Sequence, residues 1–204
     1  MNGFTIILYG LFLKMVLADR ISILVNTVFG QVFMYGTIEL VIGAIGFAIQ
    51  IYCDFGSYSL IAIGTAQVMG FELMENFNTP YFAHSIKDFW RRWHISLSSW
   101  LRDYLYIPLG GNRHGKIRKY INIMVTFLMS GLWHGASWNY VIWGGLHGIY
   151  QVIGEMTNPL RGKIQNILKI NTTCDSYRLW QVGSTFFLTT FAWIFFRADS
   201  LKDA

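Results

Sequence analysis

The sequence predicts an all-α integral membrane protein built from several helices, some of them re-entrant or broken, with one amphipathic helix lying in the membrane interface. Of its 204 residues, 53% are hydrophobic and only 13% are charged, whereas soluble domains average about 45–50% apolar and roughly 25% charged residues. Apolar runs of helical length recur along the chain, and one basic stretch carries several tryptophans. We therefore expect a single membrane-embedded core over residues 1–204.

The net charge of +5 fits contact with the anionic headgroups of a lipid bilayer better than binding to nucleic acid. Two cysteines, Cys53 and Cys174, are too few for a disulfide framework. The first residues enter an apolar run without the basic segment or cleavage site of a signal peptide, so we expect none.

The first third of the chain alternates apolar runs with short polar interruptions. Residues 4–18 contain Lys14 and are too short for a full span of about 20 residues, and Asp19 and Arg20 end that run at an interface. A second short helix is expected at residues 21–33. Longer apolar helices are predicted at residues 37–52 and 59–73, on either side of a turn at residues 53–58.

Asp54 supplies a carboxylate to that turn. It fits a helix cap or turn acid, and it also fits a substrate contact between two spans.

Residues 85–106 have the pattern of a basic amphipathic helix. Ser85 and Asp88 resemble a capping box at its start, and apolar residues then recur at helical spacing, including Trp90 and Trp93. Tryptophans with interspersed Lys and Arg are typical of a helix in the interface plane. At about 100° per residue, His94 falls on the flank of the buried face.

A break inside an apolar hairpin places a histidine within the membrane. The run at residues 120–132 is too short to span, a second run occupies residues 138–153, and basic residues follow at both outer ends. The hairpin is therefore predicted to dip in from the cytoplasmic side and to turn at residues 131–137. Non-helical backbone at that depth needs protein or a water-filled cavity around it, so His134 is predicted at the bottom of a cavity.

An imidazole kept neutral by desolvation can take a proton from a hydroxyl that attacks an acyl carbonyl. A second polar residue can position that group or stabilise the charge that develops on the oxygen. No Gly-x-Ser-x-Gly motif is present, which favours direct acyl transfer over a covalent acyl-enzyme. Two alternatives remain. His147 is either a structural core residue or a haem or metal ligand paired with His134, and broken helices also occur in transporters.

Four segments, residues 76–80, 88–98, 102–112 and 131–139, resemble the membrane-bound O-acyltransferase (MBOAT) family. The resemblance is nearest to its alginate-type polysaccharide O-acetylation branch, with the D-alanyl transfer branch as a near cousin. It implies a ring of helices around a central funnel, with His134 and His94 as catalytic residues. We expect substrate contacts from Trp93, Trp133, Asn139 and Asp54, and no metal site.

The resemblance further implies transfer of an acetyl group from a cytoplasmic donor, acetyl-CoA, with no bound cofactor. An SGNH-type extracytoplasmic partner would finish the transfer to a polysaccharide such as alginate or a cell-wall glycan. The expected location is the plasma membrane of a bacterium, crossed several times. D-alanyl transfer to teichoic acid is the alternative.

Two departures from the family pattern matter. Family members are roughly twice as long, so the chain is expected to be a partial core that lacks the family's N- and C-terminal helices. The branch usually has Ser-Gly-Tyr followed by an acid after the first acidic residue. Here Gly56 and Ser57 are reversed and Leu60 replaces the acid, which leaves Asp54 as the carboxylate nearby.

Overall fold

The computed structural model describes residues 2–204, and its regular elements within that range are all helical. Two of these helices, α3 (Thr37–Val68) and α8 (Asp175–Arg197), are long and apolar enough to cross a membrane. The prediction of an all-α membrane protein is confirmed. The chain divides into a first unit, Met1–Asn78 with Arg197–Ala204, and a second unit, Thr79–Phe196; the single core over residues 1–204 stays a prediction.

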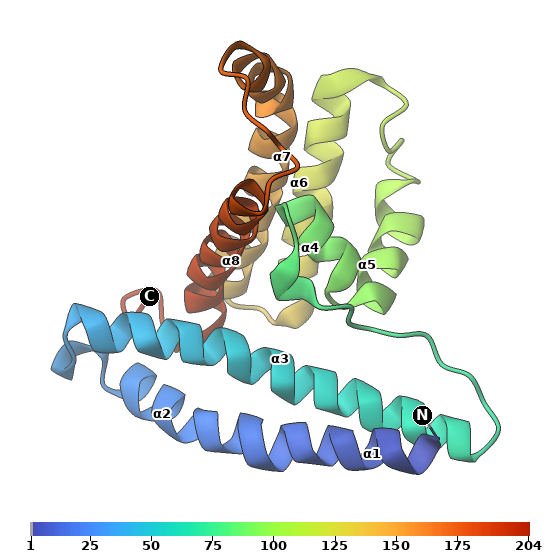
Figure 1. The fold of residues 1–204 in the computed structure, drawn as a ribbon, viewed down its shortest axis with the longest axis vertical. Helices are drawn as coiled ribbons and strands as arrows, with labels where there is room; N and C mark the ends of the chain where they lie inside the picture. Colours follow the sequence, from blue (N-terminus) through green and yellow to red (C-terminus); the bar gives the residue numbers. More distant parts are fainter. Residues whose placement is uncertain (1) are drawn as a thin grey trace. The chain divides into compact units, whose positions relative to one another are not determined.

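In the first unit, one long helical run packs along α3 (Figure 1). The run consists of α1 (Gly3–Phe12), a π-helical turn (Leu13–Ala18) and α2 (Asp19–Gly30), and a 3₁₀ turn (Val32–Met34) leads back into α3. Small residues let the two backbones approach, because a Cβ added to Gly64 would lie 2.6 Å from the carbonyl oxygen of Gly3. The predicted helix end at Asp19 is wrong, because Asp19 pairs with Lys14 (3.1 Å) and the helix continues.

The predicted turn at residues 53–58 is also wrong, because α3 runs through it without a break. The polar groups there are satisfied inside the helical structure. Lys14 Nζ donates to Asp54 Oδ1 at 2.6 Å, and Ser57 Oγ donates to the Asp54 carbonyl at 2.7 Å. Asp54 therefore has its hydrogen-bond partners while it lies inside the helix. The predicted break at residues 76–80 is confirmed, since the chain is non-helical from Gly70 to Thr79.

The second unit starts with a 3₁₀ turn (Pro80–Phe82) and a short helix, α4 (Ile86–Arg92). The predicted cap is confirmed, because Ser85 Oγ accepts from the Asp88 backbone N–H at 3.1 Å. A single helix over residues 85–106 is wrong. The chain breaks at Trp93 and His94 and resumes as α5 (Ile95–Leu101), followed by a π-helical turn (Arg102–Tyr106).

An antiparallel hairpin of α6 (Gly115–His134) and α7 (Trp138–Ile167) forms the frame of the second unit (Figure 1). The predicted turn at residues 131–137 is confirmed only at residues 135–137, because residues 131–134 belong to α6. Both helices are longer than predicted, because α6 includes the basic residues at its start and α7 continues beyond residue 153. Glycines bring them close: a Cβ on Gly131 would overlap the carbonyl oxygen of Tyr140, and one on Gly144 that of Phe127.

Candidate active site

His134 is the last residue of α6, where the hairpin turns into α7. Its imidazole is half-buried among aromatic rings. Ring centroids lie 5.1 Å away for Trp143 and Phe196, and 6.2 Å away for Tyr140. The ring is therefore held in place by apolar contacts from α7 and α8, and its partial exposure leaves it within reach of a substrate.

His94 occupies the junction between α4 and α5, with a left-handed backbone (φ 44°, ψ 56°). Ser96 Oγ lies 3.4 Å from His94 Nδ1. Burial, and then the nearby His134, lower the pKa of His94 to about 4, so this imidazole is neutral at pH 7. A neutral imidazole carries one ring N–H, which can donate a hydrogen bond.

Trp133 connects the two histidines. Its ring centroid lies 5.0 Å from that of His134 and 6.3 Å from that of His94, and the indole is 60% exposed. His94 and His134, forty residues apart in the sequence, thus contact the same side chain. The arrangement offers one imidazole for proton transfer, a second for hydrogen bonding, and an exposed aromatic surface beside both.

The other predicted substrate-binding residues differ in their surroundings. Asn139 is buried in the first turn of α7, where its backbone N–H donates to Ser137 Oγ at 3.3 Å. Trp93 is 3% exposed and stacks on Phe89 at 5.5 Å, which gives it a place in the core. Asp54 belongs to the first unit and pairs there with Lys14. Substrate contact by these residues stays a prediction.

His147 is fully buried in α7, and the Trp90 indole N–H donates to its Nδ1 at 3.2 Å. Its neutral form therefore carries the proton on Nε2. Trp143 contacts the imidazoles of both His147 (5.2 Å) and His134 (5.1 Å). This packing favours the structural interpretation of His147. Among residues 2–204, no cluster of three or more His, Cys, Asp or Glu side chains is suited to hold a metal ion.

The sequence analysis did not single out several residues that lie around the two histidines. Tyr140 and Phe196 contact the His134 ring, and Ser96 lies beside His94. Tyr140 was within reach of prediction, since it follows the break by one helical turn. Phe196 was not, because its approach depends on how α8 packs.

Comparison with known proteins gives a family match over residues 3–197 to MBOAT, the membrane-bound O-acyltransferase family. The probable alginate O-acetylase AlgI of Pseudomonas syringae pv. tomato is 42% identical over the whole of this chain, which covers 37% of that protein. The peptidoglycan O-acetyltransferase of Helicobacter pylori is 39% identical over 99% of this chain and 37% of its own length. The teichoic acid D-alanyltransferase of Bacillus subtilis is 36% identical over 51% of this chain and 28% of its own length. The chain thus spans less than two fifths of these relatives.

Proposed function

The chain belongs to the membrane-bound O-acyltransferase family, and from that premise we propose that it carries the histidine site of an O-acetyltransferase acting on an extracytoplasmic polysaccharide. The observation that carries the proposal is the meeting of His134 and His94 on the exposed ring of Trp133. Both histidines stand at helix ends, where side chains and backbone are accessible to a substrate.

In the proposed reaction, His134 removes the proton from an acceptor hydroxyl while its oxygen attacks the carbonyl of an acetyl thioester. The new C–O bond forms, the C–S bond breaks, and the imidazolium returns the proton to the leaving thiolate. An O-acetyl ester and a free thiol result, so no oxidant or further reactant is needed. General base assistance of this kind contributes about 10²–10⁴-fold.

His94 is the proposed hydrogen-bonding partner of this step. Its neutral ring carries one N–H, which can stabilise the negative charge that develops on the carbonyl oxygen. Trp133 supplies an exposed apolar surface beside both imidazoles, against which a substrate can pack.

For the whole protein, we propose acetyl-CoA as the cytoplasmic donor and an SGNH-type extracytoplasmic protein as the partner that completes transfer to a glycan. The plasma membrane of a bacterium is the proposed location. The alginate and peptidoglycan O-acetyltransferases among the relatives support this acceptor class. D-alanyl transfer to teichoic acid is the second candidate, supported by a relative aligned over 51% of this chain.

The test follows radiolabelled acetyl from acetyl-CoA into extracytoplasmic glycan, in membranes that contain the full chain and its partner. We expect His134→Ala to lower incorporation by at least about 10²-fold at equal protein level, because the general base is lost. His114→Ala is the matched control, since His114 is an exposed histidine that precedes α6.

Full activity of His134→Ala would show that the mechanism is wrong. If the wild type incorporates labelled D-alanine and no acetyl, the second candidate replaces the first.

A further inference from the structure

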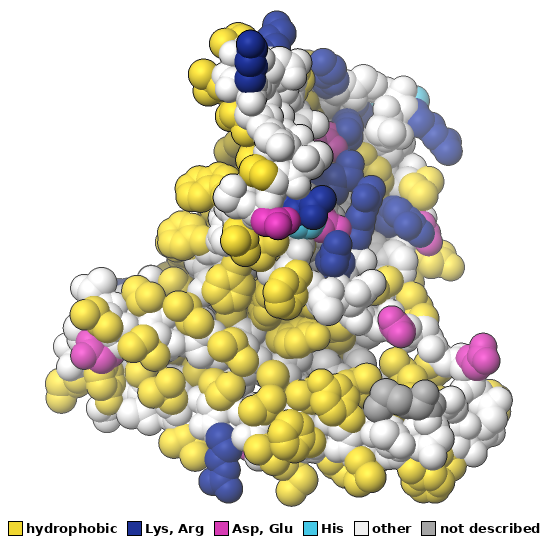
Figure 2. All heavy atoms as spheres, in the orientation of Figure 1, with side chains coloured by type: hydrophobic (Ala, Val, Ile, Leu, Met, Phe, Trp, Pro, Cys, Tyr) yellow, Lys and Arg dark blue, Asp and Glu magenta, His cyan; other side chains and the backbone are white. Residues whose placement is uncertain are grey.

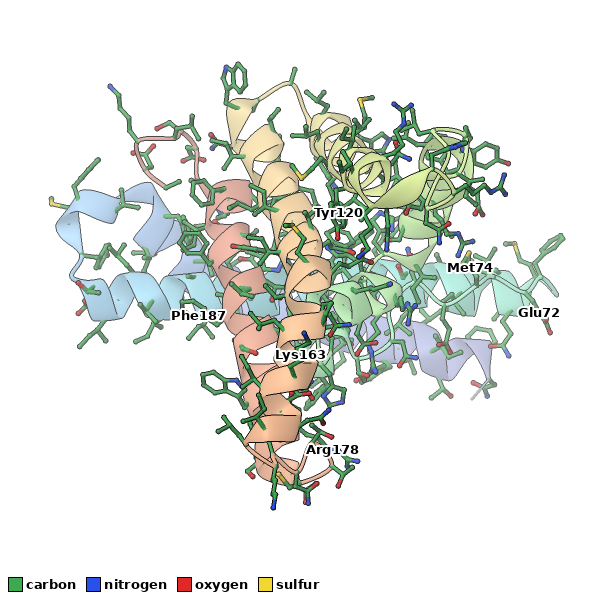
Figure 3. The ribbon with its side chains drawn as sticks, turned by 90° about the horizontal axis from the view of Figure 1, so that it is seen from above. Glu72, Met74, Tyr120, Lys163, Arg178 and Phe187 are labelled. Atoms are coloured by element: carbon green, nitrogen blue, oxygen red, sulfur yellow. The ribbon has the colours of Figure 1, made fainter. Side chains whose placement is uncertain are left out.

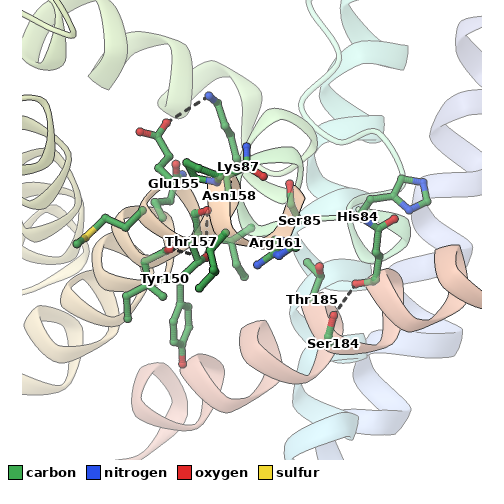
Figure 4. A pocket seen from close by; sticks show the side chains of 18 of the residues that line it. His84, Ser85, Lys87, Tyr150, Glu155, Thr157, Asn158, Arg161, Ser184 and Thr185 are labelled. Carbon is green, nitrogen blue, oxygen red and sulfur yellow. Dashed lines mark hydrogen bonds and ion pairs between the residues drawn. The ribbon is translucent and has the colours of Figure 1, made fainter. Parts of the chain in front are cut away.

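A large pocket lies at the opposite end of the α6–α7 hairpin from His134. It has a volume of about 1330 Å³ and is formed by the starts of α4 and α6, the second half of α7 and the first half of α8 (Figure 4). Lys116 lines it, and at 1.5 Å per residue of α6 this lysine is about 27 Å along the helix from His134. The pocket is therefore separate from the histidine site.

Positive charge dominates the lining of this pocket. Lys87, Lys116, Lys119 and Arg161 line it, against one carboxylate, that of Glu155. Figure 2 shows Lys and Arg side chains gathered over the part of the second unit where α6 begins and α7 ends. A concave surface with this excess of cations attracts anions, because the walls exclude water and strengthen the field inside.

Glu155 pairs with two of the four cations. Its Oε1 lies 3.5 Å from Lys87 Nζ, and its Oε2 contacts Lys119 Nζ. The carboxylate therefore offsets part of the charge of these two lysines. Among the ion pairs of residues 2–204, none involves Lys116 or Arg161, and these two cations remain available for an anion.

Exposed apolar side chains also line the pocket, among them Leu160, Ile164 and Trp180. Cations beside exposed apolar side chains match a ligand with an anionic head and a hydrocarbon body. The volume exceeds the roughly 300–1,000 Å³ of ordinary small-molecule pockets, which leaves room for a headgroup, its glycerol and the first part of its chains.

We propose that this pocket binds the phosphate group of an anionic phospholipid, with Arg161 and Lys116 on the phosphate and the acyl chains against Ile164 and Trp180. Arg forms bidentate hydrogen bonds to phosphate oxygens, and Lys binds them as a point charge. The basic end of the hairpin is expected at the cytoplasmic leaflet, whose surface is negatively charged. The proposal does not depend on acyl transfer.

A soluble phosphate compound such as coenzyme A has the same head chemistry and is the other source of such a ligand. The exposed apolar side chains of the lining favour the lipid. The two sources are separated by offering them independently, as membrane composition in one arm and as soluble coenzyme A or inorganic phosphate in the other.

The experiment reconstitutes the full chain in nanodiscs of phosphatidylcholine with and without phosphatidylglycerol. Retained lipids are counted by native mass spectrometry, and thermal unfolding is followed in parallel. We expect the wild type to retain phosphatidylglycerol selectively, with a higher Tm in its presence. Arg161→Gln and Lys116→Gln should each weaken retention about fivefold, the effect of one basic residue at an anionic surface.

Matched controls lie two residues further along the same helices. Lys163→Gln and Arg118→Gln remove exposed cations that do not line the pocket, and they should retain the lipid like the wild type. Figure 3 labels Lys163 on α7 and Arg178 near the start of α8. Glu155→Gln removes the carboxylate that competes for the lysines, so it should strengthen retention.

If Arg161→Gln and Lys163→Gln weaken phosphatidylglycerol retention equally, the retention arises from general surface charge, and the proposal is overturned. The absence of selective retention in the wild type would overturn it as well. If coenzyme A raises the Tm in an Arg161-dependent manner while phosphatidylglycerol does nothing, the phosphate site stands and the lipid source is wrong.

Discussion

His94 combines backbone strain with its proposed role. A left-handed backbone costs an ordinary L-residue about 1–2 kcal/mol, and His94 adopts one at the point where α4 passes into α5. The preceding Trp93 is fixed by its stack on Phe89 in the core, and the reversal of direction brings the imidazole against Trp133. Strain of this kind is found where the surrounding structure demands one conformation.

Glycine and alanine at this position separate the strain from the chemistry. Both His94→Gly and His94→Ala remove the imidazole, so both should lower acetyl transfer by a similar factor. Glycine adopts the left-handed backbone freely. We therefore expect the free energy of unfolding of the His94→Gly variant to be about 1 kcal/mol higher than that of the His94→Ala variant. Thermal unfolding in detergent measures the difference.

Lys169, also left-handed at φ 49° and exposed, is the control. Its Gly and Ala variants should differ in stability by the same amount and keep full activity. Equal stability of the two His94 variants would contradict the strain argument.

Helix breaks show which parts of the fold were predictable. The predicted breaks at residues 76–80 and 131–137 carry local Pro or Gly signals. The first is present, and the second is present at residues 135–137. The stretch around Asp54 carries similar signals, yet α3 continues through it, and the carboxylate pairs with Lys14, forty residues earlier. The break at His94 has no Pro or Gly beside it, and the adjacent Trp93 is buried.

The same distinction applies to the candidate site. The local motifs singled out His134 and His94 as candidates, and their contacts with Trp133 agree with the proposal that they act together. The packing of Phe196 on His134 was not predictable, because it depends on a contact between helices far apart in the sequence.

Two adjacent glycines in α7 give a sharp test of the hairpin. A Cβ on Gly144 would overlap the carbonyl oxygen of Phe127, whereas one on Gly145 would meet only Leu128 Cδ2 at 3.7 Å, an ordinary contact. Because a backbone atom has little freedom to move, Gly144→Ala should destabilise the protein by about 1–3 kcal/mol. Gly145→Ala should be neutral or slightly stabilising, through its higher helix propensity. Thermal unfolding of both variants checks this, and equal effects would contradict the close packing of α6 on α7.

At the scale of the whole molecule, charge and apolar surface are unevenly distributed. Apolar side chains cover most of the visible surface of α1 to α3, while Lys and Arg gather where α6 begins and α7 ends (Figure 2). The connector between α7 and α8 is flanked by Lys169 and Arg178. By the positive-inside rule, this connector is expected on the cytoplasmic side.

Cys174 lies in that connector and reports on this orientation. Hydrogen bonds with Ser176 and from the backbone N–H of Tyr177 hold the pKa of the Cys174 thiol below its usual range. Its thiolate fraction at neutral pH is therefore raised, and it should react readily with maleimide, whereas Cys53 is buried in α3. A membrane-impermeant maleimide should label the chain in inside-out vesicles and leave right-side-out vesicles unlabelled.

The labelling rate should rise with pH, because the ionised thiol is the reactive form. The pH at which the rate is half its maximum should be lower than the corresponding pH for a free cysteine. Cys174→Ser should abolish labelling, and Cys53→Ser should leave it unchanged. Labelling confined to right-side-out vesicles would reverse the orientation. It would place the phosphate pocket, which shares this end of α7 and α8, on the outer face, and the donor for acyl transfer would then have to approach from the other end of the hairpin.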